Sequence, residues 1–169
     1  QAILRQGEEA AEKLFLEWLD LFGEDYYVEL QRHHLENIDG TGLSQEDINQ
    51  VLLKWAKKYD VKVIATNDSH YLDQDDWNAH DILLCVNTGD KRSTPKGQGR
   101  GFRFGFPNDQ FFFKTQAEML QLFKDIPEAL DNTNEIVDKI NTPQLKRDIL
   151  LPNFTLPSGF TDMDDYLKH

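Results

Sequence analysis

The chain alternates between two apolar patterns, and this alternation most limits the folds it can adopt. Residues 8–22 and 44–59 each place apolar side chains at i, i+3, i+4, i+7 and i+11, the spacing of one buried stripe on a helix. Residues 26–30 and 61–66 are short runs rich in β-branched and aromatic residues, which are typical of strands. A strand, a crossover helix and a strand in this order form a right-handed parallel unit, so the sequence predicts an α/β fold.

Helix ends can also be predicted from single residues. Gly23 should end the first helix, Ser44 should cap the second, and Asp75 should cap a third. The third helix has an apolar stripe that we expect to be buried, formed by Ala79, Ile82, Leu83 and Val86. Cys85 lies beside this stripe and is predicted to be a small buried hydrophobe.

Residues 89–107 differ sharply from the α/β region before them. This stretch holds five glycines and two prolines, and Asp90 is its only acid. We predict a long basic loop. Its cations, with the phenylalanines near its end, could follow a single nucleic-acid strand by charge and stacking, although the same composition also describes a disordered loop. The candidate nucleic-acid contacts are Lys91, Arg92, Lys96, Arg100 and Arg103.

The remainder of the chain divides into helices and a linker. Phe111–Phe113 could form a short strand, and Thr115 begins a capping box ahead of two consecutive helices. Three prolines follow, and residues 162–167 could form a last helix. The predicted domains are residues 1–114, which include the basic loop, a helical extension at 115–142 and a linker at 143–169.

Charge and composition exclude several classes of protein. The chain has 18 Lys and Arg against 30 Asp and Glu, a formal net charge of −12, so any contact with a phosphate backbone must be local. Its single cysteine excludes an internal disulfide and a multi-cysteine zinc site, and it fits a reducing cytoplasm. No apolar run approaches the roughly 20 residues needed to cross a bilayer, so we expect a soluble, cytoplasmic protein without a membrane partner.

Two residues that could bind a metal follow the second predicted strand. Asp68 and His70 lie at i and i+2 just beyond residues 61–66. The carboxyl ends of strands are where sites collect in α/β folds, and a carboxylate with an imidazole suits zinc, manganese or iron. The pair alone leaves a simple hydrogen-bonded turn as the alternative.

Arg32 and His33 follow the first predicted strand and are candidates for the mouth of the same site. Arg32 could hold a phosphate through two hydrogen bonds, with a salt bridge as the alternative. His33 could approach the metal pair or could be a solvated loop histidine. No catalytic residue is assigned in this chain.

Several blocks of the sequence, in order, carry a family resemblance. They are Tyr26–His33, Ile64–Leu72, Ala79–Asp81, Glu118–Thr133 and Leu151–Phe154. Together they resemble the alpha subunit of bacterial DNA polymerase III, the replicative polymerase of the C family.

The resemblance implies a fold and a ligand set. The fold would be the C-terminal part of a PHP (polymerase and histidinol phosphatase) domain, a distorted β/α barrel with up to three divalent metal ions at its strand ends. Asp68 and His70 match the last two ligands of that set. The other ligands would precede Gln1, and the magnesium ions of the polymerase palm would lie outside this chain. We therefore expect an internal fragment that leads toward the palm.

The resemblance also implies a function for the parent protein. It would be a DNA-directed DNA polymerase, a nucleotidyltransferase of bacterial DNA replication, with partners that include DNA, deoxynucleotides, the proofreading exonuclease subunit and other replicase subunits. The PHP region would be a metal-dependent 3′–5′ exonuclease or a structural domain. The fragment alone is expected to be inactive. The alternatives are a free-standing PHP-type metallophosphoesterase and a scaffold, without catalysis, that docks the exonuclease.

Overall fold

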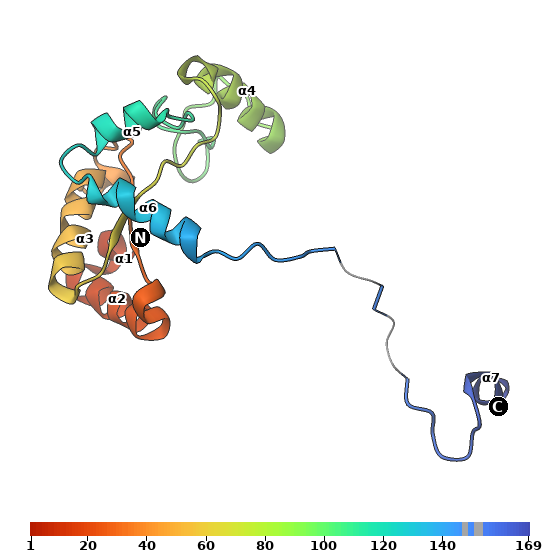
Figure 1. Ribbon diagram of the computed structural model, residues 1–169. Coiled ribbons are helices and arrows are strands. Elements are labelled where there is room, and N and C mark those ends of the chain that lie inside the picture. The colour runs from red at the N-terminus through yellow and green to blue at the C-terminus, as the bar shows by residue number, and fades with distance from the viewer. Residues whose placement is uncertain (147–148, 151–153) are drawn as a thin grey trace. The chain divides into compact units, whose positions relative to one another are not determined.

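The computed structural model describes residues 1–146, 149–150 and 154–169 (Figure 1). The chain divides into two compact units, Gln1–Lys139 and Ile140–His169, which are described separately. The first unit is mixed α/β, as the sequence predicts. Its helices and strands are α1 (Ala2–Gln6), α2 (Glu8–Phe22), β1 (Val28–Leu30), α3 (Gln45–Tyr59), β2 (Val63–Ala65), α4 (Trp77–Thr88), α5 (Gln116–Leu122) and α6 (Glu128–Lys139).

The two strands form a parallel pair joined by α3, which confirms the predicted strand–helix–strand unit. Val28 lies opposite Val63, and Leu30 lies opposite Ala65. The paired strands are shorter than the apolar runs that predicted them. Beyond Ala65, Thr66 still donates its N–H to the Leu30 carbonyl at 3.1 Å, and the chain then leaves the ladder.

The helix ends mostly follow the predicted signals. Gly23 ends α2 with a positive φ of 55°, a conformation that glycine adopts without steric cost. Ser44 caps α3 in a capping box with Asp47. Thr115 caps α5 in the same way with Glu118. Helix α1 was not predicted, because five residues are too few to show a periodic apolar pattern.

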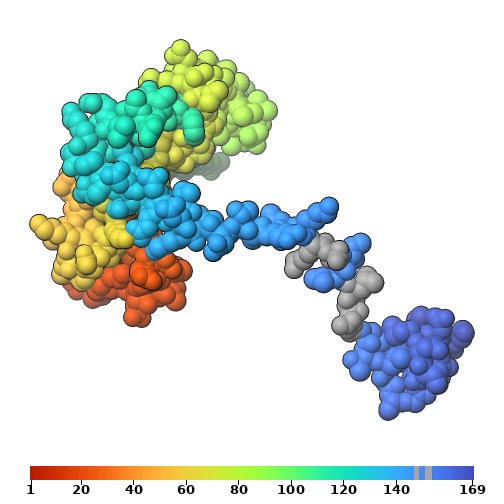
Figure 2. Space-filling view, in the orientation of Figure 1, coloured from red at the N-terminus to blue at the C-terminus, as the bar shows by residue number. Residues whose placement is uncertain are grey.

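The core of the first unit lies between the parallel strands and the helices around them. Phe15 packs near Tyr26 and Trp55, with ring centroids 5.3 and 5.5 Å apart. Helix α6 packs against β2, and Ala129 on it is fully buried. Figure 2 shows α5 and α6, in teal to cyan, lying against the yellow and orange part of the chain. Part of the predicted helical extension, 115–142, therefore shares the core of the α/β region.

Helix α4 differs from its prediction in two respects. A 3-10 turn, Gln74–Asp76, precedes it, and the Asp76 carboxylate accepts the Asp73 N–H at 3.1 Å. Asp75 lies inside this turn, so its predicted capping role is wrong. The apolar stripe that was expected to be buried is exposed, and the face of α4 that carries Asp81 and Cys85 is buried instead. Asp81 is paired by cations on its buried side, and this pairing sets which face of the helix points inward.

The segment from residue 89 to 113 contains bridges but no strand. Within the basic loop, Gly97 donates its N–H to the Arg103 carbonyl at 3.1 Å, and Arg103 donates to the Pro95 carbonyl at 2.9 Å. The strand expected at Phe111–Phe113 is reduced to a single bridge between Phe112 and Tyr71. The pairing stops there because the partner segment turns after Leu72 into the 3-10 turn that precedes α4.

The second unit holds one short helix among its described residues. Asp162 caps helix α7 (Met163–Lys168), because its carboxylate accepts the Asp165 N–H at 2.8 Å, and this helix confirms the last predicted one. Most of the predicted block Leu151–Phe154 lies outside the described residues. Within the described parts of the chain, no helix is both long and apolar enough to cross a membrane.

Candidate metal centre

The turn that carries Asp68 and His70 is fixed against a distant segment. Just beyond β2, the Asn67 amide donates to the Phe112 carbonyl at 2.7 Å. Three residues later, the His70 N–H donates to the Phe111 carbonyl at 2.7 Å. These bonds hold the turn at the carboxyl end of β2, where the sequence places it, so both side chains leave the strand end together.

Asp68 and His70 are in direct contact. The Asp68 Oδ1 and His70 Nε2 atoms are 3.1 Å apart, and their side chains are 51% and 37% exposed. Two ligands that each lie about 2.0–2.2 Å from one cation are roughly 2.8–3.1 Å apart in octahedral geometry and roughly 3.3–3.6 Å apart in tetrahedral geometry. The pair therefore fits adjacent positions on one divalent metal. Within the described residues, no group of three or more His, Cys, Asp or Glu is arranged to hold a metal.

Aromatic rings enclose the inner side of His70. The Phe106 ring lies 4.4 Å from the His70 ring, and the His80 ring lies 5.7 Å away, measured between centroids. Phe111 is 4.5 Å from Phe106 and links this group to the segment that holds the turn. His80 comes from α4, and its pKa is lowered mainly by burial. The imidazole of His70 thus lies between an aromatic wall and solvent.

His33 is buried, not solvated. It is only 1% exposed, and its ring stacks on Phe111 with centroids 4.4 Å apart. Its Nδ1 lies 3.3 Å from the Gln45 amide nitrogen, whereas its Nε2 has no hydrogen-bond partner among the described residues. Burial lowers the pKa of His33 to about 4, so the ring is neutral near pH 7. The structure does not bring His33 into a common ligand group with Asp68 and His70.

Arg32 forms salt bridges, the alternative weighed against phosphate binding. Its guanidinium donates to both carboxylate oxygens of Asp125, at 2.6 and 2.9 Å, and to both of Glu46, each at 3.1 Å. It also donates to the Leu122 carbonyl at 2.8 Å. The Asp125 carboxylate is the main cause of a raised pKa of Arg32. These partners use the donors that a phosphate would need, and they join the end of β1 to α3 and the α5–α6 connection.

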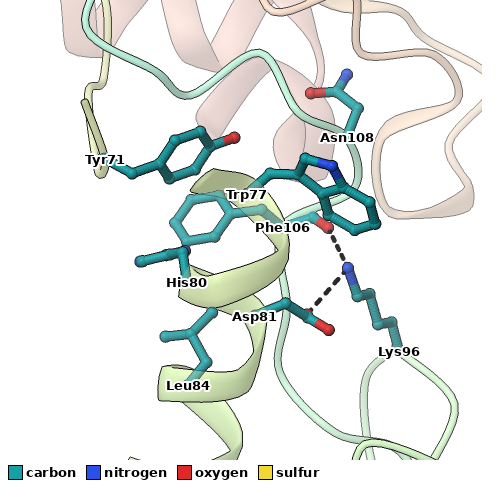
Figure 3. Close-up of a pocket in the computed structure, with 8 residues that line it drawn as sticks. All are labelled: Tyr71, Trp77, His80, Asp81, Leu84, Lys96, Phe106 and Asn108. Carbon is teal, nitrogen blue, oxygen red and sulfur yellow. Dashed lines mark hydrogen bonds and ion pairs between the residues drawn. The ribbon is translucent and has the colours of Figure 1, made fainter. Parts of the chain in front are cut away.

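The basic loop is anchored through Asp81, which the sequence alone does not indicate as a site residue. Arg103 is 5% exposed and donates to both Asp81 oxygens, at 2.9 and 2.8 Å. Lys96 Nζ lies 3.1 Å from Asp81 Oδ1 (Figure 3). The pairing with Arg103 holds the pKa of Asp81 at about 2. The available signal was a loop with many cations and one acid, which lacks enough carboxylates of its own to pair them.

The five cations predicted to contact nucleic acid therefore lie in different environments. Arg103 is buried, and Lys96 has a side chain that is 33% exposed and bound to Asp81. The remaining three, Lys91, Arg92 and Arg100, are exposed. Arg92 also donates to the Asn78 side chain, which holds it beside α4.

Comparison with known proteins adds family membership to this geometry. No model of a protein family matches the chain. The chain is 34% identical to the DNA polymerase III subunit alpha of Borreliella burgdorferi, over 168 residues that cover 99% of the chain and 14% of that protein. The Pseudomonas aeruginosa subunit is 36% identical, with 98% of the chain and 13% of the protein covered. The Thermus aquaticus subunit is 33% identical, with 99% and 13% covered. The chain belongs to the DNA polymerase III alpha-subunit family.

Almost the whole chain aligns with each of these alpha subunits. The resemblance therefore extends beyond the separate blocks to the residues between them. The chain spans only 13 to 14% of the length of these alpha subunits. The match therefore includes the Asp68–His70 turn, α4 and the basic loop, and it corresponds to a small part of each alpha subunit.

Proposed function

We propose that the chain is part of a replicative DNA polymerase, a bacterial enzyme that extends DNA by nucleotidyl transfer. Near-complete coverage of the chain by three alpha subunits supports this proposal. The parent protein would act in the cytoplasm on DNA and deoxynucleotides, together with other replicase subunits. Magnesium ions for nucleotidyl transfer would be held outside this chain.

We further propose that the first unit is part of a PHP-type distorted β/α barrel with a divalent metal at its strand ends. The parallel β1–β2 pair and the position of Asp68 and His70 after β2 support this assignment. The observation that carries the proposal is the 3.1 Å separation between Asp68 Oδ1 and His70 Nε2. Zinc, manganese or iron suits a carboxylate–imidazole pair. When bound, such a metal would activate water for attack on a phosphate ester, in an exonuclease, or would stabilise the fold.

The two side chains would act together in holding the metal. Asp68 would donate a carboxylate oxygen, and His70 would donate Nε2, which must be unprotonated to bind. Their mutual contact would then be replaced by two bonds to the same ion, so the pair is arranged before the metal arrives. Since this chain offers two ligands among its described residues, the rest of the coordination shell would come from water or from other parts of the parent protein.

Metal binding by the whole alpha subunit tests this proposal. We would titrate the purified, metal-stripped protein with Co²⁺ and measure its visible absorption and its bound metal. Asp68→Asn and His70→Gln should each weaken binding by about tenfold or more. Asp60→Asn is the matched control, because Asp60 is an exposed aspartate with left-handed φ, which Asn also tolerates. Equal Co²⁺ affinity in all four proteins would refute the metal site.

Primer extension tests whether nucleotidyl transfer needs parts of the parent protein outside this chain. The whole alpha subunit should incorporate deoxynucleotides, whereas residues 1–169 alone should incorporate none. Asp162, Asp164 and Asp165 are explained by the start of α7, where acids favour the helix dipole and Asp162 caps the helix. Incorporation by the isolated chain would overturn this assignment.

A docking role for the proofreading exonuclease subunit is a second candidate, favoured by α4. Its outward stripe leaves Ile82, Leu83 and Val86 between 44% and 73% exposed, an unusual position for three apolar residues on one helix face. We propose that this stripe forms part of the docking surface. In a pull-down with the whole alpha subunit, Leu83→Lys should weaken exonuclease capture, while Leu120→Lys, on exposed α5, should not. Equal capture by both variants would exclude α4 from the surface.

The free-standing metallophosphoesterase weighed from the sequence shares the Asp68–His70 feature but gains no support from the relatives described above, all of which are polymerase subunits.

A further inference from the structure

Two cations of the basic loop, Arg103 and Lys96, bind the same carboxylate, that of Asp81. Asp81 lies on α4 and is 4% exposed. Arg103 contacts it through both terminal nitrogens, and Lys96 approaches its Oδ1 to 3.1 Å. A buried ion pair joined by two hydrogen bonds is costly to break, because removing one partner would leave the other charge buried and unpaired. This cluster of Asp81, Arg103 and Lys96 is called the clasp below.

The clasp also holds the loop backbone. Arg103 Nε donates to the Thr94 carbonyl at 2.9 Å, and its Nη1 donates to the Phe104 carbonyl at 3.2 Å. Lys96 Nζ donates to the Phe106 carbonyl at 3.0 Å, and Figure 3 shows this lysine reaching both Asp81 and the Phe106 oxygen. Each cation is thus bonded at once to the helix and to the loop, so the position of the loop depends on Asp81.

Phe106 connects the clasp to the proposed metal pair, because Lys96 bonds to its carbonyl and its ring packs against His70. Its ring lies 4.4 Å from the ring of His70 and 5.2 Å from that of His80. His80 directly precedes Asp81 on α4, so the same helical turn supplies the anchor of the clasp and one wall of the His70 environment. The contacts run without interruption from Asp81 through Lys96 and Phe106 to His70.

We propose that Asp81 is a positioning residue for His70, acting through Lys96, Arg103 and Phe106. The clasp fixes the Phe106 ring against the imidazole and so sets the direction in which Nε2 points toward Asp68. The consequence for metal affinity rests on the metal site proposed above, whereas the orientation of the imidazole does not. Residues that orient a ligating histidine are worth about 10–100-fold in metal affinity.

The alternative is a clasp that only stabilises the loop. Removing it would then lower the stability of the chain without altering the surroundings of His70. The two roles can be separated by a signal from the imidazole itself, since an aromatic ring packed at 4.4 Å shifts the resonances of the His70 ring protons.

Nuclear magnetic resonance of histidine-labelled chain provides that signal without metal. His70→Gln identifies the His70 ring peaks. Asp81→Asn should move them toward the positions of an exposed histidine, and Asp81→Glu should restore them at least in part by retaining the charge. Asp75→Asn is the control, because Asp75 is an exposed acid on the turn just before α4. His70 peaks that stay in place in folded Asp81→Asn would overturn the proposal.

A milder variant covers the case in which Asp81→Asn does not fold. Lys96→Met removes the bond to the Phe106 carbonyl but leaves the bidentate Asp81–Arg103 pair. It should shift the His70 peaks in the same direction, by less. Unchanged peaks in this variant would likewise count against the proposal.

Metal affinity of the whole alpha subunit completes the test. Asp81→Asn should weaken Co²⁺ binding about tenfold, and Asp75→Asn should leave it unchanged. If the wild-type protein binds no Co²⁺, the metal site fails, and the His70 resonances still decide the positioning role. If Co²⁺ binds and Asp81→Asn matches the control, the positioning of a metal ligand by Asp81 is wrong.

Discussion

At the scale of single residues, burial decides which groups can carry charge. His33 and Arg32 are neighbours at the end of β1, yet their side chains are satisfied in opposite ways. The His33 imidazole is enclosed against Phe111 and stays neutral, whereas the Arg32 guanidinium keeps its charge because two carboxylates surround it. Neither side chain is free to bind a phosphate, so we expect both to contribute to the stability of the fold.

His33 should make the stability of the chain depend on pH between about 4 and 6.5. Its pKa is about 4 when folded, against an ordinary 6.5 when unfolded, so in this window the unfolded chain binds more protons. Stability must then fall as the pH falls, by about 3 kcal/mol in total from this residue. Urea unfolding measured at pH 7 and pH 4.5 checks the slope.

The matched variant for this prediction is His33→Phe, which keeps an aromatic ring against Phe111 and removes the titrating group. Its unfolding free energy should change less between the two pH values than that of the wild type. Acidic groups contribute equally to both proteins, so an identical pH slope would contradict the assignment.

Arg32 should matter for stability well beyond an ordinary surface ion pair. Its side chain is 13% exposed and joins Glu46, Asp125 and the Leu122 carbonyl. Arg32→Lys keeps the charge but loses the planar fork, and we expect a loss of about 1–3 kcal/mol. Lys13→Met, which removes an exposed i,i+4 pair with Glu9, should cost about 0.5 kcal/mol or less. Similar thermal unfolding of the two variants would refute this stabilising role of Arg32.

At the scale of elements, local signals predicted the helices better than they predicted the orientation of the helices. The apolar spacing of residues 8–22 and the capping residues Ser44 and Thr115 act within one or two turns, so the sequence contains everything they need. The strand–helix–strand unit followed from the same patterns. The single bridge at Phe112 depends on a partner segment at Tyr71, and no local pattern reveals such a distant pairing.

Helix α4 shows why the candidate site was harder to predict than the fold. Its apolar stripe predicted one buried face, but a buried ion pair with Arg103, more than twenty residues away, selected the other. Periodicity measures only the helix itself and not the charges of its neighbours. Asp68 and His70 could be named as candidates because they follow a strand directly, whereas Asp81 gained its partners only through the tertiary fold.

The exposed stripe of α4 gives a sharp prediction on stability. Leu83→Lys should change the unfolding free energy of the chain by about 0.5 kcal/mol or less, because Leu83 is 54% exposed. Cys85→Lys should cost several times more, on the order of 3 kcal/mol, because Cys85 is 7% exposed and a lysine there would bury a charge. Chemical denaturation of both variants checks this, and a large loss for Leu83→Lys would mean that the stripe is buried after all.

At the scale of the whole molecule, local and total charge have opposite signs. The chain carries a formal net charge of −12, while the basic loop exposes Lys91, Arg92 and Arg100. Asp81 pairs with Arg103 and Lys96, and its Oδ2 also lies 3.9 Å from Arg92 Nε, at the outer limit of a salt bridge. Any attraction to a nucleic acid must therefore be short-ranged and sensitive to salt.

A triple substitution of the exposed loop cations tests this contact. Lys91→Gln, Arg92→Gln and Arg100→Gln together should weaken binding of a single-stranded DNA oligonucleotide and lower the slope of log affinity against log salt by about 2. The matched control replaces three exposed lysines on other elements, Lys13, Lys57 and Lys124, by Gln and changes the net charge by the same amount. Fluorescence anisotropy at several salt concentrations measures both. If the control loses as much affinity as the loop variant, total charge explains the binding, and the loop is not the contact.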